Sequence, residues 1–269
     1  MLLRLLIAAA MLAAGAPAAR AGLFGTLKFN ASDRAGPISL RKRVHVNTLI
    51  TEPGTMEIEW GGAFSADGGF TFPTTIKYTP EGRHVYWGRT EFSASFDSLA
   101  SSLQPEGRTT HFSDRATFAA NCVIHDGEKL DLALAPLVSV LLRGDGGVRL
   151  GATAIARYDA GRSSLGVTLT WTAATARSDT NPAGTFDLGA GYGFRLKPSG
   201  PLGHLTPHVN WLYEKSTGGV RQISLFEGVE YQITEKIAVD FSGQHFAVWG
   251  GQPDNQVVVG LTANLGKLK

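Results

Sequence analysis

The sequence predicts an all-β fold, a transmembrane up-and-down antiparallel β-barrel of about 12 strands. Three observations predict it. Apolar and polar residues alternate over most of the chain, turn-forming residues separate the alternating runs, and the N-terminus has the layout of a secretory signal peptide. An exported chain whose strands each present one apolar face suits a bacterial outer membrane, which is the location we expect.

The N-terminal segment, residues 1–21, is expected to be a signal peptide that is removed on export. Met1 to Arg4 is a short basic start, and Leu5 to Ala14 is an apolar run too short to span a membrane as a helix. Ala19-Arg20-Ala21 has the small residues of a cleavage site. The mature protein would then begin at Gly22.

The remaining chain divides into two parts. Residues 22–54 are expected to be a periplasmic leader or a plug segment, and they include the basic run Arg41-Lys42-Arg43. Residues 55–269 carry the alternation and are expected to form the outer-membrane barrel. No other segment has the long unbroken apolar run of a spanning helix, so a helical membrane protein is excluded.

Charge and cysteine content narrow the expected partners. The chain has 25 Lys and Arg against 23 Asp and Glu, and loss of Arg4 and Arg20 leaves 25 − 2 = 23 basic residues, a formally neutral protein. A neutral protein lacks the basic excess that phosphate binding requires, so nucleic acid is not an expected partner. Cys122 is the single cysteine, so no intramolecular disulfide can hold the fold.

The alternation divides the chain into about 12 runs, and spanning strands need about 9–11 residues each. Asp-Gly dipeptides at 67–68, 126–127 and 145–146 predict hairpin turns, because Gly adopts positive φ without a steric penalty. Short connections favour antiparallel pairing of consecutive strands. The runs are residues 56–64, 70–78, 86–96, 107–124, 130–140, 147–158, 165–172, 186–196, 205–214, 219–233, 236–249 and 257–265.

The two faces of these strands differ in chemistry. Aromatic residues lie on the apolar face near strand ends, which is typical of rings at the two interfaces of a membrane. The other face mixes Gly and Thr with charges, and we expect it to line the lumen. A soluble barrel or sandwich with its apolar face inward remains the alternative. The candidate lumen-lining residues are Glu57, Glu59, Lys77, Arg89, Glu91, Asp131, Arg149, Arg157, Asp187, Arg195, His208, Glu214 and Glu230.

Two stretches resemble a known family. Thr51 to Gly62 and Lys77 to Phe92 resemble the first strands of a bacterial outer-membrane family named for the MetA pathway of phenol degradation. The resemblance implies an outer-membrane barrel with a role in uptake, and it supplies no catalytic residue. One departure is the C-terminus, Leu265 to Lys269, which lacks the final aromatic residue that the barrel-assembly machinery, an expected partner, reads in many such barrels.

Three functions follow as hypotheses. The first is a channel, surrounded by membrane lipid, for passive uptake of a small hydrophobic or aromatic solute. The second is a closed barrel that serves structure or anchors partners. The third is a lipid hydrolase using His111 and Ser113, which an i, i+2 spacing places on one face of a strand. A nucleophile also needs an orienting group and an oxyanion site, so we do not expect an enzyme.

No cofactor or metal site is expected. The seven histidines have no cysteine partners and no paired helical spacing. The glycines of residues 189–193 belong to a strand pattern and do not precede a helix, so they do not form a phosphate-binding loop.

Overall fold

The computed structural model describes residues 50–65, 68–81, 90–104, 107–112, 115–142, 147–175, 183–196, 204–217, 221–234, 236–248 and 254–267. The predicted signal peptide and all of the leader up to residue 49 lie outside these residues. Among the residues that the structure describes, no helix is long and apolar enough to cross a membrane.

The described part of the chain is almost entirely β-strand. The strands are β1 (Thr55–Ser65), β2 (Phe70–Tyr78), β3 (Thr90–Gln104), β4 (Gly107–His111), β5 (Arg115–Asp126), β6 (Leu130–Leu141), β7 (Val148–Ala160), β8 (Ser163–Ala174), β9 (Gly184–Phe194), β10 (Leu205–Ser216), β11 (Arg221–Gln232), β12 (Ile237–Val248) and β13 (Asp254–Lys267).

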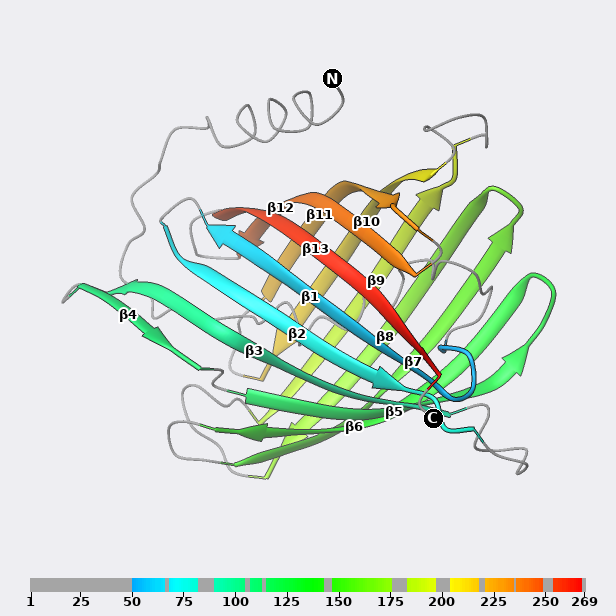
Figure 1. Ribbon diagram of the computed structural model, residues 1–269. Coiled ribbons are helices and arrows are strands. Elements are labelled where there is room, and N and C mark those ends of the chain that lie inside the picture. Colours follow the sequence, from blue (N-terminus) through cyan, green and yellow to red (C-terminus); the bar gives the residue numbers. More distant parts are fainter. Residues whose placement is uncertain are drawn as a thin grey trace, which may run out of the picture.

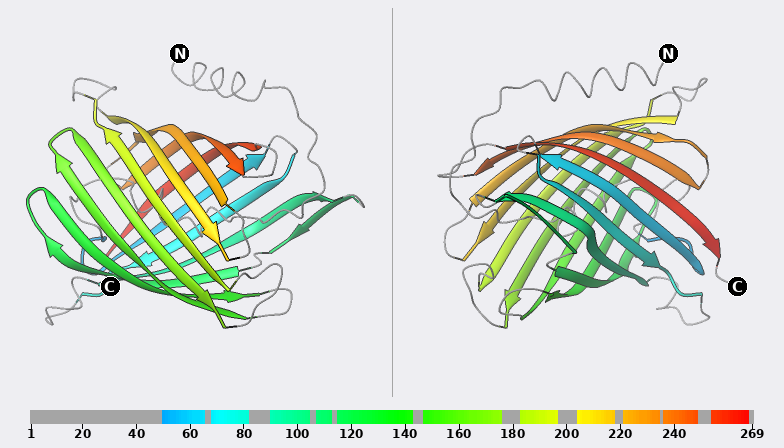
Figure 2. Two further views of the ribbon diagram at one scale, coloured as in Figure 1. Left: turned by 180° about the vertical axis from the view of Figure 1, so that it is seen from behind. Right: turned by 60° about the vertical axis from the view of Figure 1, so that its left-hand side comes forward.

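All of these strands belong to one antiparallel sheet that closes on itself (Figures 1 and 2). Each strand from β5 to β13 pairs with the next, β1 pairs with both β13 and β2, and β2 pairs with β3, which pairs with β5. The closed barrel therefore has twelve strands, as predicted. The alternative of a two-sheet sandwich is wrong, because a single closed sheet holds every strand.

The short strand β4 stands outside this ring. It pairs with the far part of β3, from Ala100 to Gln104, and extends beyond the barrel rim (Figure 1). The single run predicted over residues 107–124 is therefore two strands, β4 and β5. The prediction missed the division because the alternation alone does not show that β4 turns back on β3 before the chain re-enters the barrel.

The hairpin turns explain why consecutive strands pair. Between β1 and β2, the N–H of Gly68 donates to the carbonyl of Ser65 over 3.0 Å, and Gly68 has a φ of 84°. Between β7 and β8, Gly161 has a φ of 67° in a connection of two residues. Both positions require the left-handed backbone that Gly adopts most readily.

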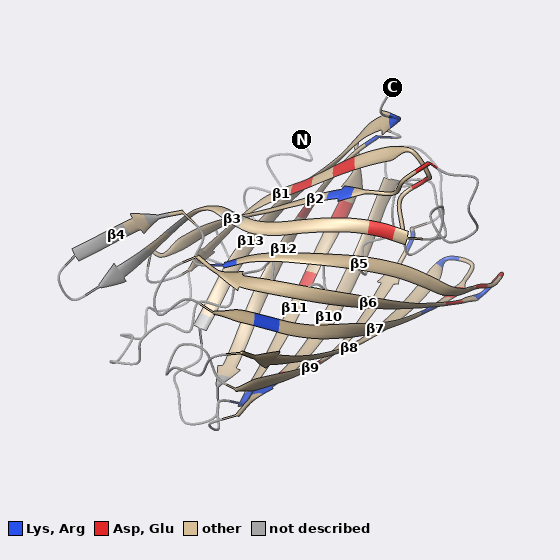
Figure 3. Ribbon diagram, turned by 90° about the horizontal axis from the view of Figure 1, so that it is seen from below, with Lys and Arg blue, Asp and Glu red and all other residues tan. Residues whose placement is uncertain are grey.

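The polarity of the barrel is inverted relative to a soluble protein. On β1 and on most strands from β6 to β12, exposed apolar side chains alternate with buried polar ones, and the buried apolar set contains few large residues. Charged residues appear as isolated segments on otherwise uncharged strands (Figure 3). Exposed large apolar residues on the strands include Trp60, Phe64, Phe118, Leu134, Leu150, Tyr158, Leu169, Trp171, Tyr192, Trp211 and Leu261.

One polar cluster interrupts the apolar exterior. Nε2 of the exposed His245 on β12 lies 3.3 Å from Oε1 of the exposed Glu227 on β11, within hydrogen-bond distance. Nδ1 of His245 also lies 2.8 Å from Oδ1 of Asn255 on β13. The interaction between the ring and Glu227 offsets part of the cost of a carboxylate in an otherwise apolar band.

Close packing of neighbouring strands at Gly151 provides a test of the sheet. A Cβ atom at Gly151 would lie 2.2 Å from the carbonyl oxygen of Trp171 and 2.8 Å from Cγ2 of Thr172. Gly151→Ala should therefore destabilise the barrel by about 1–3 kcal/mol through overpacking. Gly243→Ala is the control, because its nearest atoms would be 3.7 Å away. Urea unfolding measures both, and an equal response would contradict this account.

Candidate functional site: the polar interior

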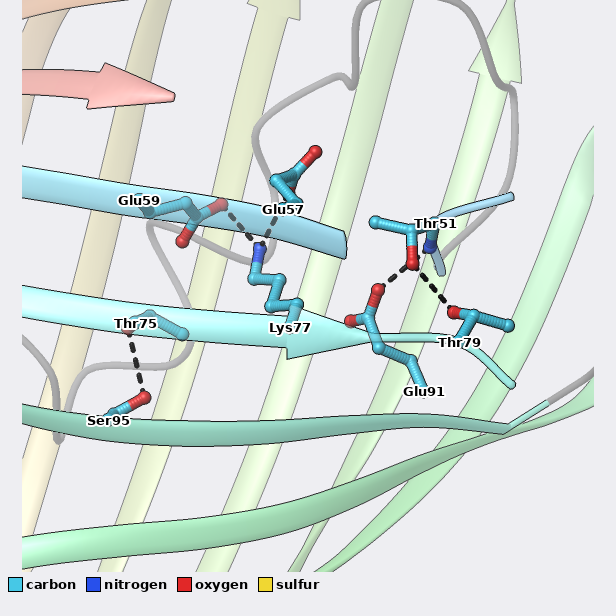
Figure 4. Close-up of polar contacts among 8 residues, drawn as sticks. All are labelled: Thr51, Glu57, Glu59, Thr75, Lys77, Thr79, Glu91 and Ser95. Atoms are coloured by element: carbon cyan, nitrogen blue, oxygen red, sulfur yellow. Dashed lines mark hydrogen bonds and ion pairs between the residues drawn. The ribbon is translucent and has the colours of Figure 1, made fainter. Parts of the chain in front are cut away.

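A buried ion-pair cluster lies on the inner face of β1 and β2. The register sets Glu57 opposite Lys77, and alternation places Glu59 on the same face. Nζ of Lys77 lies 3.4 Å from Oε1 of Glu57 and also contacts Oε1 of Glu59 (Figure 4). The three side chains are 4–7% exposed. Buried charges need partners and further hydrogen bonds, so this arrangement joins the two strands inside the barrel.

The chain enters β1 from inside the barrel mouth. The backbone N–H of Thr51 donates to Oε2 of Glu91 over 2.8 Å, and the hydroxyl groups of Thr51 and Thr79 are 2.6 Å apart (Figure 4). The N–H of Gly54 donates to the carbonyl of Thr79 over 2.7 Å. These contacts fix the residues before β1 against β2 and β3.

Two buried arginines lie on the inner face of β7. Nε and Nη2 of Arg149 donate to Oγ1 of Thr172 over 3.1 and 2.7 Å, and Nη2 also donates to Oγ1 of Thr185 over 3.3 Å. Arg157 forms a 2.8 Å ion pair with Asp159, which follows it on the same face. The first guanidinium thus reaches across β8 to β9, and the second is held along its own strand.

Carboxylates dominate the part of the wall from β9 to β12. The register sets Asp187 on β9 opposite Glu214 on β10, and Glu230 on β11 opposite Asp240 on β12. Among the buried residues that the structure describes on β9 to β12, no Lys or Arg occurs. Like charges placed directly opposite each other repel, so these pairs favour positive charge nearby.

His208 reaches across a glycine to a third strand. Its Nε2 lies 3.2 Å from Oγ of Ser242, although β11 separates their strands. A Cβ atom at Gly228 would lie 2.4 Å from that hydroxyl oxygen, so the glycine leaves the space for this contact.

The structure places the thirteen candidate residues in different environments. Glu57, Glu59, Lys77, Glu91, Asp131, Arg149, Arg157 and Glu214 are buried, and Asp187, His208 and Glu230 are half-buried. Arg195 follows the end of β9 and is exposed. Arg89 lies outside the described residues. Close contact joins Glu57, Glu59 and Lys77, whereas the other candidates are spread around the wall.

Three large inward apolar residues of β10 to β12 were missing from the sequence-based set. Leu212, Phe226 and Phe246 are buried on the polar face of β10, β11 and β12. The register makes Phe226 a neighbour of Asn210 and Gln244, both of which are also buried. The three apolar residues were missed because the candidate set held only charged residues and one histidine, although Glu230, which shares the inner face of β11 with Phe226, was in it.

Metal binding can be assessed within the described residues. No group of three or more His, Cys, Asp or Glu side chains there could hold a metal ion. The hydrolase hypothesis is not assessed, because Ser113 and the side chain of His111 lie outside the described residues.

The Lys77 cluster makes a stability prediction. Lys77→Met should destabilise the barrel by about 3–5 kcal/mol, because it removes the cation beside two buried carboxylates. The matched control is Lys267→Met, which breaks the exposed 3.2 Å pair between Lys267 and Glu81 and should cost at most about 1 kcal/mol. Urea unfolding measures the loss of unfolding free energy in each variant. Equal losses would contradict the prediction that burial makes the Lys77 cluster more important for stability than the exposed pair.

Comparison with known proteins gives the fold. No protein-family profile matches the chain, and no curated protein matches it in sequence. Among solved structures, the chain is similar to the KdgM porin, with 12% identity, a TM-score of 0.51, and coverage of 77% of this chain and 98% of that one. It is also similar to the NanC porin, with 10% identity, a TM-score of 0.54 and the same coverage. The chain therefore has the fold of these porins.

Proposed function

We propose that the protein is a channel in the bacterial outer membrane for passive movement of small solutes. The observation that carries the proposal is the inverted polarity of a closed twelve-stranded sheet, apolar outside and polar inside. Lipid stabilises an apolar exterior that water would penalise. Closure pairs the backbone groups of the sheet, which the hydrocarbon region requires.

The number of strands favours a narrow passage. A barrel of about eight strands is filled by its own side chains, whereas sixteen or more leave a wide channel. Twelve strands fall between these cases, and large side chains such as Arg149 and Phe226 project inward. Small solutes fit such a bore, whereas folded macromolecules do not.

The narrower proposal is that the solute is hydrophobic or aromatic. The family resemblance of Thr51 to Gly62 and of Lys77 to Phe92 suggests it, and the apolar patch of Leu212, Phe226 and Phe246 supports it. Aromatic rings offer stacking or edge contacts to an aromatic solute, and the surrounding polar residues keep the rest of the path wetted.

A closed structural barrel is the second candidate. The observation that favours it is the complete burial of small inner side chains, since Thr79 and Ser224 are both 0% exposed. An empty bore would leave such residues open to water. In this alternative, the Lys77 cluster and Arg149 brace the wall and nothing passes.

Single-channel recording separates the two candidates. Protein extracted from the membrane and inserted in a planar bilayer should give discrete conductance steps, and phenol should reduce them more than glycerol does. Phe226→Ala with Phe246→Ala should weaken the phenol block by about five- to tenfold, which corresponds to about 1 kcal/mol of lost ring contact. Leu225→Ala changes an exposed residue and is the control. Folded, inserted protein without steps in any variant would favour the closed barrel.

A further inference from the structure

We propose that Lys215 and Arg221, on the outer face of β10 and β11 at one rim of the barrel, bind the phosphate headgroup of a lipid in the surrounding membrane. The inference rests on the proposed function only in placing the barrel in a membrane, and it holds whether or not solutes pass through the bore. Three observations support it: the position of the two cations, the depth at which they lie, and the chemistry of the outer face around them.

The two cations occupy one cross-strand position outside the barrel. Lys215 on β10 pairs with Arg221 on β11, and both side chains are exposed. The adjacent pair, Glu214 and Gln222, is buried on the inner face, so alternation places the cations on the outer face. Cβ atoms of directly opposed residues lie about 4.5–5.5 Å apart, so both charges can reach one anion. Like charges at such a position repel each other, and an anion bound between them would offset the repulsion.

Aromatic residues indicate the depth of the pair in the membrane. Trp211 and Tyr213 precede Lys215 on the same face of β10, and their rings stack with centroids 6.4 Å apart. Trp and Tyr on the outer face of a barrel gather where hydrocarbon meets the headgroups. Lys215 lies two residues beyond Tyr213, or about 5 Å further out on a tilted strand. The headgroup layer is roughly 5–8 Å thick on each side of a bilayer, so the cations fall within it.

The outer face of the neighbouring strands supplies no carboxylate to this pair. Lys215 also pairs with Phe186 on β9, whose side chain is exposed. Along β9, β10 and β11, which the structure describes in full, the only outward carboxylate is that of Glu227. It lies six residues from Arg221, or about 20 Å along the strand, and its Oε1 is 3.3 Å from Nε2 of His245. Salt screens exposed charges at such a distance, so a counter-charge for the pair must come from outside these strands.

The surroundings of the pair suit a lipid rather than a free anion. A guanidinium can donate two parallel hydrogen bonds to a phosphate, and an ammonium adds a second positive charge. Below the pair, Trp211 and Leu225 face each other across β10 and β11, and both are exposed. With its phosphate between the cations, a lipid would lay an acyl chain over these apolar side chains and bury their surface.

Lipid titration of the folded barrel tests the site. The protein, extracted from the membrane in a neutral detergent, is titrated with phosphatidic acid, whose headgroup is a bare phosphate, and the dissociation constant is measured. Lys215→Gln with Arg221→Gln should weaken binding by roughly tenfold or more, because each cation near a lipid headgroup contributes separately. Lys129→Gln with Lys236→Gln removes the same charge from exposed connections at the opposite rim and should leave the affinity unchanged. Heat-dependent gel mobility verifies that each barrel is folded.

Equal affinities of the native protein and the Lys215 and Arg221 variant, or equal losses in both variants, would overturn the proposal. Diacylglycerol, which has no phosphate, should bind the native barrel at least tenfold more weakly, and equal binding would refute a headgroup site. Inorganic phosphate that displaced the lipid at the lipid's own dissociation constant would show a site for a free anion instead.

Conductance in planar bilayers tests the proposed function separately. A barrel that binds phosphatidic acid through this pair but gives no conductance steps would refute the channel and leave the lipid site established. Conductance in a barrel whose lipid affinity does not depend on Lys215 and Arg221 would do the reverse.

Discussion

Closure of the sheet between β1 and β13 is the constraint on which the rest of the structure depends. Thr55 pairs with Lys267, and the two strands remain paired as far as Ser65 and Gln256. A sheet left open here would expose two edges of unpaired backbone groups, which are costly in hydrocarbon. Because closure satisfies those groups, the outer side chains are free to be apolar and the inner ones to be polar.

Register then decides the character of the interior. Side chains alternate with a period of two, so a slip of one residue between β1 and β13 would exchange Glu57 and Glu59 with Met56 and Ile58. On the other side of β1, the buried contacts of Lys77 with both glutamates stabilise the register of β1 against β2 from inside. The same cluster that belongs to the candidate channel wall thus also favours one alignment of β1 and β2.

The period of two was enough to predict the strand count and the single antiparallel sheet. The alternation of the sequence matches the burial of Glu57, Lys77 and Arg149 and the exposure of Trp171, whereas their lining of a lumen stays a prediction. It did not predict the opposition of Asp187 to Glu214 or of Glu230 to Asp240. Those pairs depend on cross-strand register, which hairpin geometry and closure determine together.

The mistakes of sequence reasoning have local physical causes. Phe226 and Phe246 were missed because the candidate set was drawn from the charged residues and one histidine of the polar face, and so passed over apolar residues on that face. Arg195 is in phase with the inner residues of β9, but it lies beyond the strand end and is exposed. Alternation identifies a face, whereas burial also depends on how far each strand extends.

The hairpin of β3 and β4 shows how that extension can vary. β3 has 15 residues against 9 in β2, and its last residues pair with β4 beyond the ring. Bilayer thickness sets the length of the spanning part, because exposed backbone is costly only in hydrocarbon. Past the rim, water can satisfy an unpaired edge. Insertions and deletions in this hairpin can therefore accumulate without altering the barrel, which makes it a site where related proteins can diverge and where a peptide tag can be inserted.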